Sequence, residues 1–316
     1  MAEIQDDKAQ HVIPFILPLL EQHRKAHASS PNPAPFFIGL NGVQGAGKSV
    51  LVDILKSTLK SPPYGLSTVV FSLDDLYLTH ADQVALARGN PDNPLLQHRG
   101  QPSTHDVPLA LEVFAGLKAN RPTKIPQYNK ALFAGQGDRV PSEKWEEVNT
   151  SPANRVQVVL FEGWSVGFRP LEQAEIERKH AAAVAALERS TPEAPYLGRL
   201  GHNTLENVVT INDALRKYDE LTSQLDAFVH IDAHDSQYVY KWRLQQEAGL
   251  RAAKGSGMTD EQVKHFVDGY YPAYELYTDT LRSGVFRGIL SDGEWQGKQL
   301  RLVVDENRKV KEVVQI

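Results

Sequence analysis

The feature that most constrains this chain is a glycine-rich run in its first fifty residues. Residues 42–49 read G-V-Q-G-A-G-K-S, which fits the pattern G-x-x-x-x-G-K-[ST] of a phosphate-binding loop. Glycine adopts backbone conformations closed to other residues, so successive N–H groups can turn inward around phosphate oxygens. A short apolar run at 36–40 precedes the motif, and a segment with helical apolar spacing at 50–56 follows it. This order of strand, loop and helix predicts an α/β fold built around a polyphosphate site.

The phosphate loop also predicts which residues bind a nucleotide and its metal ion. Lys48 can reach the β- and γ-phosphates, and the hydroxyl of Ser49 can bind Mg²⁺. The helix that follows adds the positive end of its dipole. The expected nucleotide-binding residues are Gly42, Val43, Gln44, Gly45, Ala46, Gly47, Lys48 and Ser49.

The composition of the chain argues against several classes of protein. Its 316 residues carry a net charge of −5, which argues against a general binder of nucleic acids or membranes. No run approaches the ~18 apolar residues of a membrane span. The chain has no cysteine, so disulfides and thiolate metal sites are excluded. The first residues are acidic and resemble neither a secretory signal nor a transit peptide, so we expect a cytoplasmic protein.

Further apolar runs extend the pattern of alternating strands and helices. Strands are predicted at 67–73, 156–161 and 227–232, and helical segments separate them. Such alternation is typical of a parallel sheet covered by helices on both faces. Near the end of the chain, the segment 300–314 predicts a β-hairpin.

The remaining segments suggest how the chain is divided. A helix at 8–28 and a proline-rich linker form a predicted N-terminal piece, 1–35. Residues 36–316 then form a single predicted domain. Within it, a stretch near 172–206 is rich in Ala, Glu, Arg and Pro, and we interpret it as a surface insertion with one amphipathic helix.

Two predicted strands end in carboxylates. Asp74 and Asp75 follow the second strand, and Glu162 follows the third. Ligands of an open parallel sheet bind beyond the carboxyl ends of its strands, where the phosphate loop also lies. Glu162 is therefore a candidate Mg²⁺ ligand, directly or through water, and Asp74 is a candidate base and a second Mg²⁺ candidate. Asp75 is expected to point away and stabilise the loop; the alternative for all three is that they only cap the strand ends.

Two loops are unusually dense in polar residues and could bind an anionic acceptor. The first, 96–106, precedes a helix that starts near Pro108, and Asp106 or Thr104 could cap that helix. The second, 125–130, is followed by Arg139. The alternative is that both are ordinary solvated loops. The candidate acceptor-binding residues are Asp74, Tyr77, Arg99, His105, Asp106, Tyr128, Lys130 and Arg139.

A basic helix predicted at 238–253 could close over the site. It carries Arg243 and Arg251, and a lid that brings positive charge over a transferred phosphoryl group is a common device in this chemistry. The alternative is a solvated helix face.

These residues together resemble the phosphoribulokinase, uridine kinase and pantothenate kinase group of phosphate-loop kinases. Within that group the chain is most similar to the D-glycerate 3-kinase family of plants and fungi, over roughly 36–277. The shared stretches are G-V-Q-G-A-G-K-S, L-D-D-L-Y-L-T, H-R-G-Q-P-S-T-H-D, Q-Y-N-K followed by G-D-R, E-G-W, W-R-L-Q-Q-E and G-M-T.

The resemblance implies transfer of the γ-phosphoryl group of ATP to the 3-hydroxyl of D-glycerate. Asp74 falls on the position of the group's catalytic base. The nucleotide and metal positions fall on Lys48, Ser49 and Glu162, and the lid positions fall on Arg243 and Arg251. The insertion near 172–206 departs from the shorter members.

Two alternatives stay open at this point. A nucleotide-dependent switch would need D-x-x-G and N-K-x-D; the first is missing, and Asn129-Lys130 lacks the Asp of the second. A kinase for another acceptor, such as another hydroxy acid, a pantothenate-like compound or a nucleoside, has the same donor residues. The sequence leaves the oligomeric state undetermined.

Overall fold

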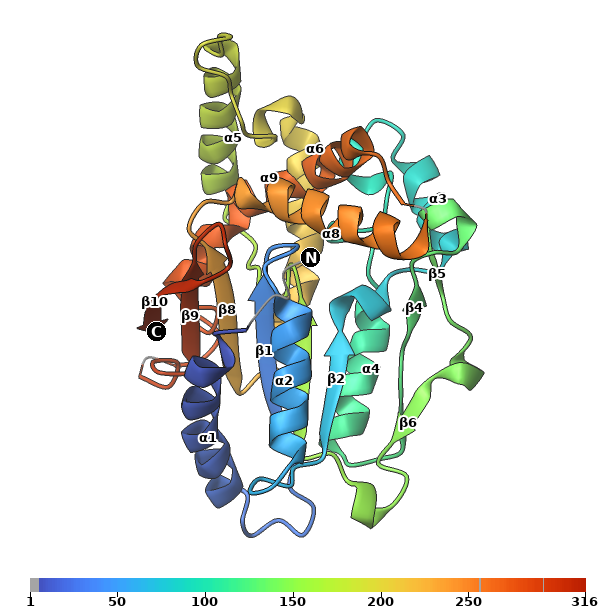
Figure 1. The fold of residues 1–316 in the computed structure, drawn as a ribbon, viewed down its shortest axis with the longest axis vertical. Coiled ribbons are helices and arrows are strands. Elements are labelled where there is room, and N and C mark those ends of the chain that lie inside the picture. The colour runs from blue at the N-terminus through green and yellow to red at the C-terminus, as the bar shows by residue number, and fades with distance from the viewer. Residues whose placement is uncertain (1–5, 256, 292) are drawn as a thin grey trace.

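The centre of the molecule is a mostly parallel sheet. The computed structural model describes residues 6–255, 257–291 and 293–316, and within them a six-stranded sheet has the order β10-β9-β8-β1-β7-β2 (Figure 1). Neighbouring strands run parallel except β9 and β10, which form an antiparallel hairpin. The predicted α/β fold, with a central parallel sheet and a C-terminal β-hairpin, is therefore confirmed. The strands are β1 Phe36–Gly42, β2 Thr68–Ser72, β7 Val158–Gly163, β8 Ala227–Ala233, β9 Gln299–Val304 and β10 Val310–Gln315.

Two smaller sheets extend from one side of this core. Strand β3 (Thr123–Ile125) pairs with β6 (Glu146–Val148), and β4 (Tyr128–Asn129) pairs with β5 (Asp138–Arg139). The second of these sheets holds the loop 130–137, which carries Lys130 toward the carboxyl-end edge of the main sheet.

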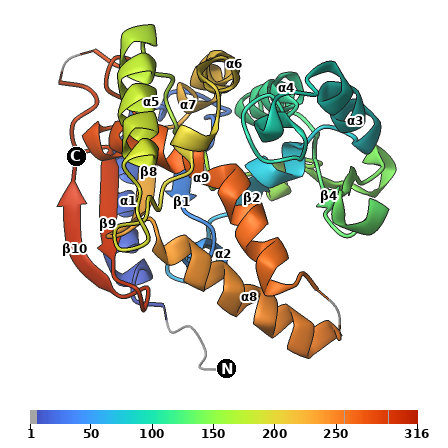
Figure 2. The same cartoon turned by 90° about the horizontal axis from the view of Figure 1, so that it is seen from above.

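Helices cover both faces of the sheet (Figures 1 and 2). Consecutive strand residues point to opposite faces, and the first two residues of β1 show what each face meets. Phe36 lies edge-on to His23 of α1, with ring centroids 5.4 Å apart, and Phe37 stacks on Phe114 of α4 at 5.1 Å. The helices are α1 Ala9–Ala26, α2 Lys48–Lys60, α3 His80–Gly89, α4 Val107–Lys118, α5 Gln173–Glu188, α6 Leu205–Leu215, α7 Asp219–Thr222, α8 Tyr238–Lys254 and α9 Asp260–Ser283.

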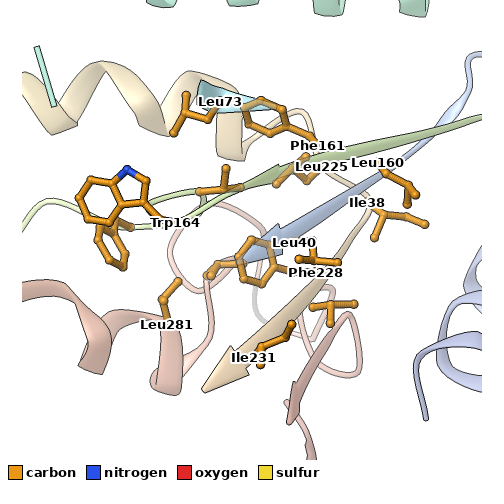
Figure 3. Close-up of a cluster of buried hydrophobic side chains, with 14 of the residues drawn as sticks. Ile38, Leu40, Leu73, Leu160, Phe161, Trp164, Leu225, Phe228, Ile231 and Leu281 are labelled. Carbon is orange, nitrogen blue, oxygen red and sulfur yellow. The ribbon is translucent and has the colours of Figure 1, made fainter. Parts of the chain in front are cut away.

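The central strands are buried on both faces, which explains why each reads as a continuous apolar run. Figure 3 shows the resulting core, with Ile38 and Leu40 of β1 between Phe161 of β7 and Phe228 of β8. Trp164 lies at the end of this cluster, directly after β7. The core therefore reaches to the edge where the strands end.

Helix α1 is packed into the same core. Its residues Val12, Phe15, Ile16 and Leu20 are buried there together with β1. The division into a piece at 1–35 and a domain at 36–316 stays a prediction.

The stretch near 172–206 contains one long helix, α5, as predicted. It projects from the body of the molecule (Figure 1). Its returning loop is held to α9, because the carboxylate of Glu275 accepts from the backbone N–H groups of Arg199 and Leu200, both at 2.8 Å.

Helices α8 and α9 form a hairpin across the carboxyl-end edge of the sheet, above β1 and β2 (Figures 1 and 2). The predicted basic helix at 238–253 is thus one arm of a helical hairpin over the phosphate loop. In the part of the chain that the structure describes, no helix is both long and apolar enough to cross a membrane.

Candidate active site

The phosphate loop connects β1 to α2 and depends on its glycines. Gly45 and Gly47 have φ angles of 81° and 97°, which side chains rarely tolerate. A Cβ atom on Gly45 would also lie 2.6 Å from the Cβ of Trp242 in α8. Glycine at position 45 is therefore required both by the backbone and by the packing of α8.

Lys48 points back along the loop that precedes it. Its Nζ donates to the carbonyl oxygen of Gly42 at 2.8 Å. Burial lowers the pKa of Lys48, and the charges of Glu162 and Asp74 oppose that shift. Ser49 follows at the second position of α2 and is exposed. The lysine therefore lies near both carboxylates that the sequence placed at the strand ends.

A single hydroxyl connects the carboxylate of Glu162 to the backbone of Asp74. In the sheet register, Leu40 of β1 pairs with Glu162 of β7, which pairs with Ser72 of β2. The hydroxyl of Ser72 donates to Glu162 Oε1 at 2.7 Å and accepts from the backbone N–H of Asp74 at 3.2 Å. Ser72 thereby fixes Glu162 and the start of the short 3-10 helix that carries Asp74.

Asp74 receives two side-chain donors. The hydroxyl of Tyr77 donates to its Oδ1 at 3.1 Å, and Nζ of Lys130 lies 2.5 Å from its Oδ2. Burial alone would raise the pKa of Asp74, but the charge and hydrogen bond of Lys130 outweigh burial and hold the pKa below its ordinary value. Asp74 is therefore a charged carboxylate, able to accept a proton.

Asp75 has a structural role, as the sequence predicted. Its Oδ1 accepts from the backbone N–H of Tyr128 at 3.0 Å, which ties the 3-10 helix to β4. Burial raises the pKa of Asp75 to about 6.

Arg99 lies over two rings of the predicted acceptor side. Its guanidinium carbon is 5.9 Å from the centroid of the Tyr77 ring and 5.7 Å from that of Tyr128. It donates to the backbone carbonyls of Gly135 and Gln136, so it holds the loop that follows Lys130.

His105 lies behind Tyr77. The two rings stack with centroids 4.5 Å apart, and His105 Nδ1 hydrogen-bonds the hydroxyl of Tyr218 at 2.7 Å. Its Nε2 is buried and has no hydrogen-bond partner within the described residues. Burial lowers the pKa of His105 to about 4, so the ring is neutral near pH 7. A neutral buried ring supports Tyr77 and contributes no charge toward an acceptor.

Asp106 and Arg139 stabilise the backbone next to Tyr77 and the start of α4. Asp106 is the cap of α4, since its Oδ1 accepts from the backbone N–H of Leu109 at 3.0 Å. The alternative cap, Thr104, instead accepts from the backbone of Gly100. Arg139 pairs with Asp106 at 3.0 Å and donates to the carbonyl of Tyr77 at 2.9 Å. Both charged groups are thus engaged with the protein.

The two lid arginines have different positions. Arg243 lies over the ring of Phe266 at 5.1 Å and pairs with Glu247 at 3.6 Å, and its charge adds to the burial that lowers the pKa of Lys48. Arg251 donates to the carbonyl of Met258 at 2.6 Å and to Asp260 at 2.7 Å. The charge of Arg243 therefore acts on Lys48 of the phosphate loop, while Arg251 stabilises the connection between α8 and α9.

The sequence did not single out the aromatic residues of α9. Gln44 of the phosphate loop donates its backbone N–H to the hydroxyl of Tyr274 at 3.4 Å, and Tyr270 donates to the carbonyl of Arg99 at 3.0 Å. Both rings also pack on Trp164, at 4.8 Å for Tyr270 and 5.6 Å for Tyr274. The signal in the sequence was the presence of three tyrosines within residues 270–274 of one amphipathic helix.

The predicted metal ligands are Ser49, Asp74 and Glu162. Among the residues the structure describes, no group of three or more His, Cys, Asp or Glu side chains could hold a metal ion. Mg²⁺ commonly takes one or two carboxylates and completes its shell with phosphate and water oxygens. Two strand-end carboxylates beside a phosphate loop fit that pattern.

The phosphate loop, the strand-end carboxylates and the helical hairpin over them define a P-loop kinase, which phosphorylates a hydroxyl group of a small molecule. No family model matches the chain. Its structure matches that of D-glycerate 3-kinase from Cryptococcus neoformans with a TM-score of 0.85 and 37% identity, covering 99% of this chain and 100% of that one. The chain belongs to the D-glycerate 3-kinase family.

Two curated relatives are kinases as well. The chain is 37% identical over 299 residues to the uncharacterized kinase mug58 of Schizosaccharomyces pombe, covering 94% of this chain and 96% of the relative. It is 36% identical over 263 residues to the chloroplastic D-glycerate 3-kinase of Arabidopsis thaliana, covering 82% of this chain. That match spans 51% of the plant protein.

Proposed function

We propose that this protein transfers the γ-phosphoryl group of ATP to the 3-hydroxyl of D-glycerate, giving ADP and 3-phospho-D-glycerate. The observation that carries the proposal is the position of Asp74, a charged carboxylate near Lys48 on one side and paired with the exposed cation Lys130 on the other. The names of the relatives support D-glycerate as the acceptor.

The donor side is the phosphate loop, residues 42–49. Its backbone N–H groups and Lys48 bind the phosphates of ATP, and Arg243 adds positive charge from the lid. Mg²⁺ would be held by Ser49 and Glu162, with Asp74 as a further ligand, and it would neutralise charge on the β- and γ-phosphates.

In the transfer step, Asp74 accepts the proton of the acceptor's 3-hydroxyl. The hydroxyl oxygen forms a bond to the γ-phosphorus, while the bond from that phosphorus to the β,γ-bridging oxygen breaks and ADP leaves. Lys48 and Arg243 stabilise the negative charge on the transferred group and on the leaving oxygen. Tyr77, whose hydroxyl donates to Asp74, fixes the direction of the carboxylate.

The carboxylate of D-glycerate is assigned to Lys130, with Arg99 as a second contact. The Lys130 side chain is 54% exposed, so it can turn toward a ligand without unpacking the loop. Arg139 is already paired with Asp106, and His105 is neutral, so neither offers a free charge. An anionic acceptor would thus enter between Asp74 and the loop 130–137.

A panel of acceptors tests the proposal. With ATP and Mg²⁺, we expect D-glycerate to yield 3-phospho-D-glycerate by mass and one ADP per product, and to exceed L-glycerate, glycerol, pantothenate and uridine in kcat/KM. Glycerol is the matched control because it carries the hydroxyls without the carboxylate. If D-glycerate yielded no product, the assignment would be refuted. If uridine or pantothenate reacted with a higher kcat/KM than D-glycerate, that compound would replace D-glycerate as the proposed acceptor.

The same assay distinguishes a kinase from a nucleotide-dependent switch. A kinase hydrolyses ATP slowly alone and transfers the phosphoryl group once the acceptor is added, whereas a switch hydrolyses ATP at a rate independent of the acceptor. The cytoplasmic location, and the prediction that neither nucleic acid nor membrane is a partner, remain inferences from the sequence.

A further inference from the structure

Arg308, near the end of the chain, contacts the phosphate loop directly. It lies in the turn between β9 and β10 with a φ of 64°, and its Nε donates to the carbonyl oxygen of Gly45 at 2.6 Å. The two residues are far apart in sequence, so nothing in the motif itself predicts the contact. Arg308 therefore stabilises the phosphate loop from a segment outside the motif.

The same guanidinium also contacts the lid helix α8. Its NH2 group donates to Oε1 of Gln245 at 2.9 Å, and its carbon lies 5.1 Å from the centroid of the Trp242 ring. The indole N–H of Trp242 in turn donates to the carbonyl of Glu306 in the same turn at 2.7 Å. One side chain thus joins the turn, the phosphate loop and the lid.

The turn is itself held by a buried lysine from the other end of the chain. Lys8 has a side chain that is 2% exposed, and its Nζ donates to the carbonyl of Arg308 at 2.9 Å. Asp7 lies 3.3 Å from Nζ of Lys8 and accepts from the backbone N–H of Val310 at 3.0 Å. Because Asp7 balances the charge of Lys8, we interpret Lys8 as a residue that positions the turn rather than one that adds positive charge to the site.

The contact between Arg308 and Gly45 matters because glycine is flexible. Gly45 has wide conformational freedom, so its neighbours must fix the peptide plane that joins it to Ala46. The bond from Arg308 holds one end of that plane, and the backbone N–H of Ala46 donates to the carbonyl of Val43 at 3.1 Å at the other end. The middle of the phosphate loop is thereby held in one shape before a nucleotide binds.

We infer that Arg308 is a positioning residue for the nucleotide: it holds the Gly45 peptide of the phosphate loop and links it to the lid helix, and Lys8 holds the turn that carries it. The inference rests on the proposed function for the identity of the donor, ATP. A charge-assisted hydrogen bond to the loop is strong enough that its loss should weaken ATP binding on the order of tenfold.

Calorimetry with a non-hydrolysable ATP analogue and Mg²⁺ tests this with the full chain. We expect Arg308→Ala to weaken binding by about tenfold or more and to raise the KM for ATP while leaving the KM for D-glycerate within about twofold. Arg308→Lys should weaken binding of the analogue nearly as much, because an ammonium group cannot contact Gly45 and Gln245 together. Lys311→Ala, another cation of the same hairpin that pairs with Asp305, is the matched control and should bind like the wild type.

The outcomes are distinct. Arg308→Ala or Arg308→Lys with wild-type affinity would overturn the inference, as would equal weakening in Lys311→Ala, which would point to charge alone. If Arg308→Ala does not fold, Arg308→Lys decides, with thermal unfolding as the check on its fold. A wild-type protein that does not bind the analogue would refute the proposed donor, whereas normal ATP binding without transfer to D-glycerate would refute only the proposed acceptor.

Discussion

Nζ of Lys130 lies 2.5 Å from Oδ2 of Asp74, so the candidate base and the nearest exposed cation of the acceptor side form one ion pair. The pair is partly solvent-exposed, and such pairs contribute little to stability. Its significance is functional: an acceptor that carries its own carboxylate can pair with Lys130, and this frees Asp74 to receive the proton of the hydroxyl.

Lys130 should therefore determine the affinity for an anionic acceptor. We expect Lys130→Ala to raise the KM for D-glycerate by about tenfold or more through loss of a charge-assisted contact, with the KM for ATP within about twofold. Steady-state kinetics with each substrate varied provide the measurement. Lys124→Ala, an exposed lysine on β3, is the matched control. An unchanged KM for D-glycerate in Lys130→Ala would exclude Lys130 from the acceptor site.

Asp75 should make stability depend on pH in the opposite sense to a salt-bridged carboxylate. Its folded-state pKa of about 6 is raised above the ordinary value of 3.8, so the folded state binds the proton more tightly than the unfolded state does. This contribution is present at low pH and is lost as pH rises from about 4 to about 6, a change on the order of 3 kcal/mol.

Asp75→Asn keeps an oxygen for the backbone N–H of Tyr128 but removes the titration. We expect the free energy of unfolding of the wild type, relative to Asp75→Asn, to fall between pH 4 and pH 7. Denaturant titrations of both proteins at the two pH values measure it. A constant difference between the two proteins would show that Asp75 does not titrate in this range.

The two lid arginines should behave differently. The charge of Arg243 acts on Lys48, so Arg243→Ala should lower kcat by about a hundredfold, as expected for loss of a group that stabilises the transferred charge. Arg251 binds Met258 and Asp260, so Arg251→Ala should keep kcat within about threefold and lower the unfolding temperature instead. Comparable losses of kcat in both variants would mean that α8 moves as a unit and brings Arg251 to the phosphates.

The sequence predicted the parts of the site that local pattern determines. The phosphate loop follows from its own residue types, and Asp74 and Glu162 follow because parallel strands end at one edge of the sheet. The role of Asp106 as a cap was also visible, since Asp precedes a helix that begins with Val107 and Pro108.

What could not be predicted depends on contacts between distant segments. Lys8 and Arg308 are 300 residues apart and meet only because α1 and the C-terminal hairpin pack beside the phosphate loop. Arg251 was predicted in the lid together with Arg243, and its contact with Asp260 depends on how α8 and α9 pack, which the local sequence does not show. The burial of His105 is likewise invisible in a polar loop, and burial is what makes it neutral.

The most direct test of the account is the rate of 3-phospho-D-glycerate formation by Asp74→Asn, with binding of an ATP analogue measured on the same preparation. Asn keeps the size of the side chain and an acceptor oxygen for Tyr77, but it cannot take a proton. We expect kcat to fall on the order of a thousandfold, while affinity for the analogue stays within about threefold. Near-normal turnover by Asp74→Asn would contradict the assignment of the base.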